Sequence, residues 1–562
     1  MLAAVAGPAG PAGTYTATSL APSGTWTNGG NAGGFSWSYP IAVPDGLGGT
    51  KPAISLSYDS QSVDGRTAAT NNQASWIGEG WDYSPGFVER SFKPCSKDGQ
   101  AGSGEACLSG NNATISLNGK SSTLVRDDAS GSWRLENDDA SKVERLTGAG
   151  NGDNNGEYWK VTTVDGTQYY FGAGRKPGSS TAPATNSAWT TPVYGNNAGE
   201  ECHQSTFAAS WCQQAWRWNL DFVVDPRGGV MTHWYDTETN RYKRDASATT
   251  PEGTLTSYIR SGNLTKITYG SKLADADTVK PTAQVIFTTA ERCLPDVGFD
   301  CAPAKLTKAN ATKWPDVPFD QSCAATGTCE NHSATFWTTK RLTKITTQVL
   351  NSAGGYDNVD SYELKHEFPN PQDGTAPALW LASVMHTGHD GATTLPTPPV
   401  TFSGKLLNNR VDSSGDNKPA LNRRRIVGIT SETGQVTDIG YADTDCAPGV
   451  GLPSAQDSNT KRCYPVYWNP DEKSSADPTL DWFHKYVVTR VTEMDPFGGS
   501  RPQEVRYEYV GDAAWHRDDD ELTEDKRRLP RTRSNATHSL VAAPVAAPRA
   551  ESVRVTDPAR LE

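Results

Sequence analysis

The chain has 562 residues and a formal net charge of −12, with 64 acidic side chains against 52 basic ones. An acidic chain without a Lys/Arg-rich block is not expected to bind nucleic acid, and the lack of a long apolar run argues against a membrane span. The 53 Gly and 36 Pro disfavour long helices, whereas 17 Trp and 20 Tyr favour strands. We therefore expect an all-β protein with little helix, made of many short strands joined by turns.

Residues 1–33 consist mainly of Gly, Ala, Ser, Thr and Pro, which is typical of a flexible lead-in. The first residues, MLAAVAGPAGPAG, lack the basic start and the long apolar core of a signal peptide. Ala4–Ala6 has the small-residue spacing found at the end of such a signal. We expect that the start of the signal is missing from this reading frame.

An alternating pattern begins at Phe35. Aromatic and apolar residues alternate with Ser and Pro over Phe35–Ile41 and again over Ile54–Tyr58, which predicts two half-buried strands separated by the turn PDGLGG. The segment Trp76–Phe92 contains aromatic residues punctuated by Gly, and it predicts a third strand that ends near Arg90.

The rest of the chain is predicted to form successive hairpins. Asn118-Gly119 and Asp165-Gly166 each lie between two strand-like arms, a signal for a two-residue hairpin turn. Three longer segments have the same order of strand, polar Gly-containing turn and tyrosine-bearing strand: Tyr258–Gly270, Arg425–Asp443 and Val487–Tyr509. Recurring units of this kind predict an extended β-structure.

The motif Asp-Pro-x-Gly-Gly occurs twice, after apolar strands. The first copy follows an arm in which Trp216, Trp218, Leu220 and Phe222 are expected on one face. A catalytic motif is rarely duplicated, whereas a structural unit often is. Pro fixes φ early in a turn, Asp caps the turn and Gly accepts a positive φ. We therefore predict structural turns at Asp225, Gly228 and Gly229 and at Asp495, Gly498 and Gly499.

The ten cysteines fall into five close couples separated by longer gaps. Five short loops closed by disulfides are the simplest interpretation, and they imply an oxidising compartment, hence a secreted or cell-surface protein. Ten reduced, buried thiols remain the alternative, because spacing does not prove connectivity. The predicted pairs are Cys95 with Cys107, Cys202 with Cys212, Cys293 with Cys301, Cys323 with Cys329, and Cys446 with Cys463.

No catalytic residue, cofactor or metal site is predicted. His386, His389 and Asp390 could ligate a metal, but a Gly-rich turn is the favoured interpretation. Residues 150–157 offer oxygen ligands without the spacing of a calcium loop, and the carboxylates of 515–525 are too close together for acid–base work. No Gly-x-Ser-x-Gly, Walker or Rossmann motif is present.

Residues 529–562 lack both Gly and aromatic residues and show no periodicity, so we expect a disordered tail, which could be out of frame. The last hairpin would then leave an open sheet edge, which tends to pair with other chains.

The region 35–92 resembles the entry region of secreted Rhs/YD-repeat proteins, shared with the B component of insecticidal toxin complexes and with plasmid-virulence-type proteins. The hairpins at 216–236 and 487–509 resemble degenerate YD repeats through Asp225, Gly228 and Tyr235 and through Asp495, Gly498 and Tyr507. The residues that match the entry pattern are Pro40, Pro44, Gly46, Gly49, Leu56, Tyr58, Ser60, Gln61, Gly78, Gly80, Trp81 and Arg90.

The resemblance implies a curved β-sheet that forms part of a hollow shell. It divides the chain into an entry region at 34–200 and a YD-like region at 201–528, between the lead-in and the tail. In the family the shell encloses a C-terminal toxin, but this sequence stops before the self-cleaving core.

We therefore expect a non-catalytic structural or carrier portion of a longer protein. Its expected partner is the rest of the shell or its toxin payload, with cell-wall or cell-surface glycan as a second class. The alternative function is a secreted carbohydrate-binding or carbohydrate-active β protein, motivated by the 17 Trp and abundant acidic residues.

Overall fold

The computed structural model describes residues 22–513 and 515, apart from 48, 49, 69, 71, 247–251, 327, 414, 450, 457 and 471–477. Residues 1–21, Gly49, residues 516–525 and the predicted tail at 529–562 therefore lie outside the described residues. The described part contains 29 strands and no α-helix, which confirms the all-β prediction. None of its helices is long and apolar enough to cross a membrane. Its 3-10 helices are η1 (Gly30–Ala32), η2 (Ser60–Val63), η3 (Cys95–Lys97), η4 (Phe207–Ala209), η5 (Leu273–Asp275), η6 (Pro303–Lys305), η7 (Ala311–Lys313) and η8 (Phe319–Gln321).

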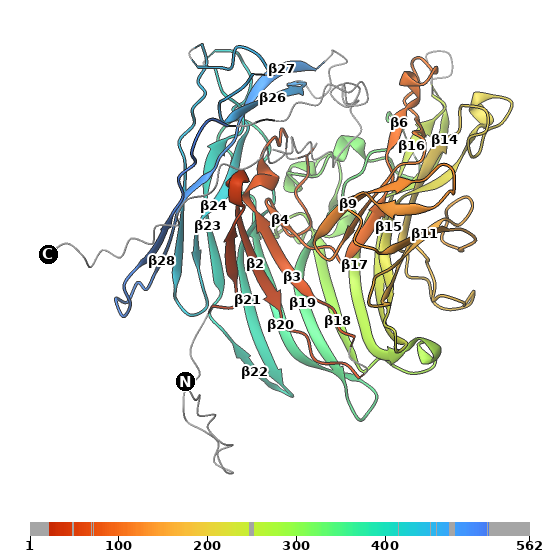
Figure 1. The fold of residues 1–562 in the computed structure, drawn as a ribbon, viewed down its shortest axis with the longest axis horizontal. Coiled ribbons are helices and arrows are strands. Elements are labelled where there is room, and N and C mark those ends of the chain that lie inside the picture. The colour runs from red at the N-terminus through yellow and green to blue at the C-terminus, as the bar shows by residue number, and fades with distance from the viewer. Residues whose placement is uncertain are drawn as a thin grey trace.

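One large antiparallel sheet dominates the molecule, and Figure 1 shows it as a curved wall of long strands. The short β22 (Thr393–Pro396) pairs with one of its strands, β21 (Trp380–Asp390). From the C-terminal edge, the large sheet consists of β29 (Gln503–Arg506), β28 (Val488–Met494), β25 (Val436–Tyr441), β24 (Asn422–Thr430), β23 (Val400–Asn408), β21 (Trp380–Asp390), β20 (Tyr356–Glu367), β19 (Lys340–Leu350), β18 (Ala283–Glu291), β17 (Thr254–Lys272), β16 (Gly229–Arg244) and β15 (Trp211–Val224).

A smaller closed ring of strands shares β15 with the large sheet. The first strand of the ring, β5 (Gly86–Glu89), pairs with Arg217–Asn219 of β15. The last strand before the ring closes, β13 (Gln168–Phe171), pairs with Leu220–Val224 of β15. The indole rings of Trp133, Trp159 and Trp218 meet edge to face inside the ring, at centroid distances of 4.9 and 6.2 Å. The strands of the ring, in order, are β5 (Gly86–Glu89), β8 (Ala113–Leu117), β9 (Lys120–Arg126), β10 (Trp133–Leu135), β11 (Lys142–Leu146), β12 (Tyr158–Thr162), β13 (Gln168–Phe171) and β15.

Three further strands flank this ring. The strand β14 (Ala188–Tyr194) pairs with the first half of β15. A short hairpin of β6 (Phe92–Pro94) and β7 (Ala106–Leu108) joins β14 through one parallel pair, Tyr194 with Cys107.

A four-stranded entry sheet packs on one face of the large sheet. It consists of β1 (Thr25–Asn28), β2 (Phe35–Ile41), β3 (Ile54–Asp59) and β4 (Trp81–Asp82). In β2 and β3 the apolar residues alternate and are buried, as predicted.

Aromatic contacts join the two sheets. Trp37 and Trp81 contact Phe402 of β23, and Tyr39 contacts Tyr362 of β20, with ring centroids 4.8 to 6.0 Å apart. Edge-to-face aromatic pairs such as these stabilise a packed core beyond the area that they bury. The entry sheet is therefore part of the main core and not a separate unit.

The predicted turns form as the residue chemistry requires. Asn118 and Gly119 both have positive φ, as in the hairpin turn of mirror-image type. In the first Asp-Pro-x-Gly-Gly turn, Oδ1 of Asp225 accepts hydrogen bonds from the amides of Arg227 and Gly229 at 2.8 and 2.9 Å, and Gly228 has φ +77°.

The second Asp-Pro-x-Gly-Gly turn repeats this geometry. The carboxylate of Asp495 accepts from the amides of Phe497 and Gly499 at 2.9 and 2.8 Å, and Gly498 has φ +75°. The duplicated motif is therefore a recurrent turn.

All five cysteine couples are joined as disulfides in sequence order. The described residues contain no free cysteine. Four of the five bridges are buried, and Cys202–Cys212 is half-buried.

Three expectations from the sequence are corrected. Within the predicted lead-in, Thr25–Asn28 form β1 and pair with β2. The segment Tyr258–Gly270 is not a hairpin, since it lies inside the single strand β17. A Cβ on Gly262 would lie 2.5 Å from Asp236 O and 2.7 Å from the Trp189 ring, so this Gly serves a close packing contact and not a turn.

The third correction concerns the Gly-rich turn that was favoured over a metal site at His386, His389 and Asp390, since all three residues lie in β21.

A two-stranded hairpin, β26 (Cys463–Trp468) and β27 (Thr479–His484), lies beyond the end of β23, at the top of the wall in Figure 1. It is held by the bridge between Arg410 and Phe483.

Candidate functional site

The segment 63–79, described apart from residues 69 and 71, connects β3 and β4 of the entry sheet and crosses one rim of the large sheet. We call this segment the clasp. Its backbone makes contacts with residues at the ends of strands β23, β24, β21, β20, β19 and β18, which all end or begin at this rim. Because the clasp runs across these strands, its carbonyl groups need side-chain partners.

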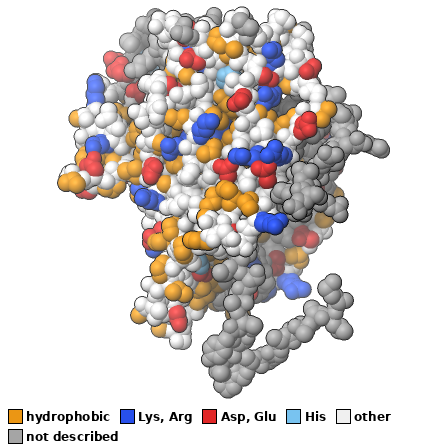
Figure 2. Space-filling view, turned by 90° about the vertical axis from the view of Figure 1, so that its left-hand side faces the viewer, with side chains coloured by type: hydrophobic (Ala, Val, Ile, Leu, Met, Phe, Trp, Pro, Cys, Tyr) orange, Lys and Arg blue, Asp and Glu red, His pale blue; other side chains and the backbone are white. Residues whose placement is uncertain are grey.

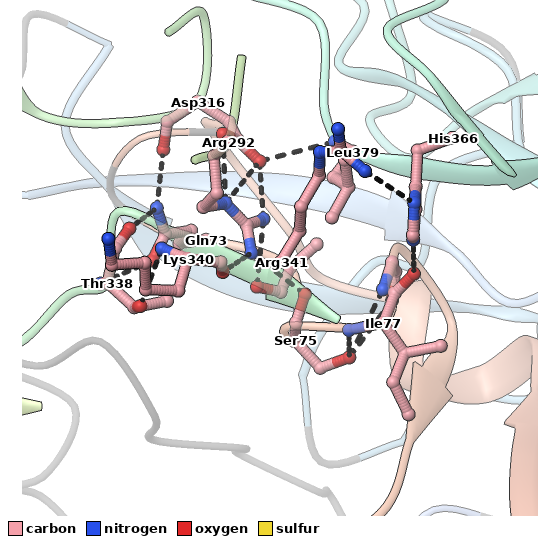
Figure 3. Close-up of polar contacts among 12 residues, drawn as sticks. Gln73, Ser75, Ile77, Arg292, Asp316, Thr338, Lys340, Arg341, His366 and Leu379 are labelled. Atoms are coloured by element: carbon pink, nitrogen blue, oxygen red, sulfur yellow. Dashed lines mark hydrogen bonds and ion pairs between the residues drawn. The ribbon is translucent and has the colours of Figure 1, made fainter. Parts of the chain in front are cut away.

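Arg292, directly after β18, lies at the centre of these contacts (Figure 3). Its side chain and that of Asp316 are both fully buried and form an ion pair with an N–O distance of 2.5 Å. The same guanidinium donates to the carbonyls of Ala74 and Ser75 in the clasp at 3.1 and 3.0 Å, and to Lys340 O at 3.4 Å. Every N–H of Arg292 thus has a partner.

Neighbouring clasp residues are held in the same way. The Gln73 amide donates to the carbonyls of Asp316 and Thr338 and accepts from the Thr338 amide, each at 2.9 Å. The backbone of Leu342 in β19 donates to Trp76 O at 2.8 Å.

His366 of β20 holds the next clasp residue, because its Nε2 donates to Ile77 O at 2.9 Å. Burial, followed by the positive charge of Arg341, lowers the pKa of His366 to about 3. His366 is therefore neutral across the physiological range, which suits a side chain that lies beside two arginines.

The end of the clasp fits closely against β21. Gly78 has φ +142°, and a Cβ there would lie 3.0 Å from Leu381 N, so the approach requires Gly. The Glu79 amide donates to Leu379 O at 2.7 Å. Burial raises the pKa of the Glu79 carboxyl, which lies 3.7 Å from the guanidinium of Arg423.

The start of the clasp is fixed by charges from much later in the sequence. Asp64 accepts from Arg425 of β24 and from Lys485, both at 2.7 Å. Asn409, just after β23, donates to the carbonyls of Val63 and Arg66 at 2.8 and 3.1 Å. The clasp therefore joins strands that lie hundreds of residues apart.

These hydrogen bonds and ion pairs hold the clasp against the rim of the large sheet. The buried charges that we name are matched by opposite charges or by hydrogen bonds. The described residues contain no group of three or more His, Cys, Asp or Glu that could hold a metal ion.

The structure separates the metal-binding candidates of the sequence. Nε2 of His386 lies 2.6 Å from Asp360, and Nε2 of His389 lies 2.9 Å from the Ser361 hydroxyl, so each imidazole has its own partner.

Residues 150–157, which offered oxygen ligands without the spacing of a calcium loop, form a loop that is anchored to the fold. Asp153 accepts from the amides of Glu157 and Ala215 at 3.0 and 2.7 Å, and the loop is thereby held against β15.

Sequence reasoning missed Arg292, Asp316 and His366. No short motif surrounds them, and their partners lie 24 to 289 residues away. Among the clasp residues, Gly78 could have indicated this site from the sequence, since it matches the pattern of the Rhs/YD entry region.

No protein-family model and no curated protein matches this chain. Among solved structures, the chain is similar to TcdB2-TccC3, with 14% identity over 83% of this chain and 23% of that one, at a TM-score of 0.39. It is similar to the Tc holotoxin pore of Photorhabdus luminescens, with 14% identity over 89% and 22% of the two chains, at a TM-score of 0.36. It is also similar to the N-terminal domain of the effector SpvB from Salmonella typhimurium, with 13% identity over 62% and 100%, at a TM-score of 0.31.

These are the protein classes that the sequence resemblance named. The chain spans less than a quarter of the length of the Tc chains.

Proposed function

We propose that this chain is a non-catalytic, wall-forming part of a secreted Rhs/YD-type carrier. The observation that carries the proposal is the clasp, a largely half-buried segment whose named charges are paired and which ties together the ends of six strands of a large curved sheet. Such a device holds the shape of a wall. The five disulfides support a location outside the cytoplasm.

The edge strand β29 supports a partner that continues the wall. Within the described residues β29 pairs only with β28. The Tyr507 amide donates to Thr489 O, and amide direction alternates along a strand, so the amides of Glu504 and Arg506 point to the open side. Figure 2, which views the side on which β28 lies in Figure 1, shows charges of both signs between small hydrophobic patches. We infer that a partner docks here through backbone hydrogen bonds.

Replacement of Arg506 by Pro tests this inference, since it removes one outward amide and leaves the pairing with β28 intact. The full chain is co-expressed with an Rhs/YD-repeat chain that carries a core and a toxin. We expect the two to copurify as one particle, and we expect R506P to weaken the complex while R506A does not. Equal recovery with R506P and R506A would contradict docking at this edge.

The absence of catalysis is tested separately on a panel of glycan, peptide and ester substrates. We expect no turnover by the purified protein. Turnover that is lost on Glu79→Gln or Asp390→Asn would overturn the proposal. A glycan array tests the carbohydrate alternative, which gains no support from Trp37 and Trp218 because both are buried.

A further inference from the structure

The small ring and the large sheet separate at the middle of β15, and we call this point the fork. After this point β15 has a partner on each edge. On one edge Leu220–Val224 pair with β13 of the small ring, and on the other edge Phe222–Val224 pair with β16 of the large sheet. The residues 172–187, which we call the β13–β14 connection, pass directly over the fork. The Asp221 carboxyl lies beneath them.

Asp221 is fully buried and is bound only by neutral groups. Its Oδ2 lies 2.7 Å from the Gly174 amide, 2.8 Å from the Ser187 hydroxyl and 3.2 Å from the Thr185 hydroxyl. Its Oδ1 has no hydrogen-bond partner. No ion pair within the described part of the chain includes Asp221.

A carboxylate in this position is costly in its charged form, because burial removes water and no cation replaces it. The neutral acid fits the same contacts. A hydroxyl can donate or accept, so Ser187 can accept the proton of Oδ2 while the Gly174 amide still donates to that oxygen. The site therefore holds a protonated aspartic acid without rearrangement.

The surroundings supply no second group that titrates near neutral pH. From β16, His233 is buried and its pKa is lowered to about 3 by burial, so it stays neutral. The pKa values of Tyr235 in β16 and Tyr158 in β12 are raised, chiefly by burial.

The nearby cations have other partners. The Arg175 guanidinium binds Ala182 O, Lys176 pairs with Asp277, and Arg217 pairs with Glu89. None of them compensates a charge on Asp221.

We propose that Asp221 is a proton-controlled latch that holds the β13–β14 connection on β15 when it is protonated and loosens it when it ionises. The connection is the part that responds, since it supplies all three donors. The same residues also tie it to the large sheet, because the Tyr235 amide donates to Thr185 O at 2.9 Å. Opening of the latch would therefore release the junction between the small ring and the large sheet.

Burial raises the pKa of Asp221 to about 7, which places the transition near neutral pH. The opened segment would have an ordinary Asp pKa of about 3.9. Between these values the closed form binds one more proton than the open form, so closure weakens as pH rises toward 7 and is constant above it.

Hydrogen exchange of the full chain, corrected for intrinsic rates, tests the proposal between pH 5 and 8. We expect the protection of amides in 172–187 to fall by up to about tenfold per pH unit below pH 7 and then to level off. In Asp221→Asn, an uncharged variant of the same shape, the protection should not vary with pH. Asp165→Asn, at an exposed turn of the neighbouring hairpin, should leave the profile unchanged.

A second variant keeps the test decisive if Asp221→Asn does not fold. Ser187→Ala removes a donor that stabilises the charged carboxylate, so the pH at which protection levels off should move upward. Protection that is independent of pH in the native chain, or a profile unchanged in Ser187→Ala, would overturn the proposal.

Discussion

Arg292 and Asp316 show how one buried ion pair can hold distant segments of the chain together. The guanidinium holds two clasp carbonyls, and Oδ2 of Asp316 also accepts from the Leu379 amide at 3.2 Å. Removal of either charge leaves the other one buried and uncompensated.

We expect Arg292→Met to lower the free energy of unfolding by about 3–5 kcal/mol, because it strands the Asp316 carboxylate and two carbonyls. Urea unfolding followed by tryptophan fluorescence measures the loss. The exposed pair Arg506–Glu504 is the control, since Arg506→Ala should leave the unfolding midpoint nearly unchanged. A similar, small loss in both variants would show that the clasp does not stabilise the sheet.

At the scale of elements, local chemistry was predictable and long-range packing was not. The turns at Asp225 and Asp495 and the five disulfides depend on residues within about twenty positions, so the sequence contains their whole cause. The burial of Leu220 and Phe222 was predicted on one face, but they belong to different core clusters because the pairing of β13 with β15 shifts register between Tyr170 and Phe171. Such a shift depends on the partner strand and leaves no local pattern.

The two Asp-Pro-x-Gly-Gly turns should differ in their sensitivity to mutation. Asp225→Ala should cost about 1–2 kcal/mol, because the side chain caps the turn and also accepts from Thr50 in the loop between β2 and β3. Asp495→Ala loses only the cap and should cost about 1 kcal/mol. Chemical denaturation of both variants gives the comparison, and the Asn variants, which keep one acceptor oxygen, should lose less. Equal losses would argue against the Thr50 contact.

The disulfides should contribute in order of loop length. Cys446–Cys463 spans 17 residues and Cys323–Cys329 spans 6. In the chain-entropy model, replacement of both cysteines by Ser should cost about 3 kcal/mol for the longer loop and about 2 kcal/mol for the shorter. Thermal unfolding of the two double variants measures the difference, and a reversed order would show that native contacts outweigh loop entropy.

At the scale of the whole molecule, buried carboxylates make stability depend on pH. Besides Asp221, the buried Glu105 accepts from the Tyr242 hydroxyl and the Asp245 amide at 2.7 and 2.8 Å. Burial raises its pKa to about 7. The folded state therefore binds extra protons between about pH 4 and 7, and stability is lost as pH rises through that range.

The two raised carboxyls, at up to about 1.4 kcal/mol each per pH unit, should raise the thermal midpoint at pH 5.5 relative to pH 7.5. The buried His233 and His366, whose pKa burial lowers to about 3, act in the opposite direction, because only the unfolded state takes up their protons near pH 6. Scanning calorimetry at constant ionic strength measures the difference. Glu105→Gln should reduce it. A midpoint that rises with pH would show that other groups dominate the proton balance.

The contacts of the clasp also set the order in which the chain can fold. Asp64 leaves the ribosome early, yet its partners Arg425 and Lys485 follow 361 and 421 residues later. The entropy of closing such long loops is not offset until the last strands are made, so the rim can be locked only at the end of folding. Until then the carbonyls and charges of the clasp lack the partners that they have in the folded protein. The nascent chain therefore stays incompletely folded for most of its synthesis. A protein that must cross a membrane unfolded would gain from this delay, since its most distant contacts form only once the whole chain is on the same side.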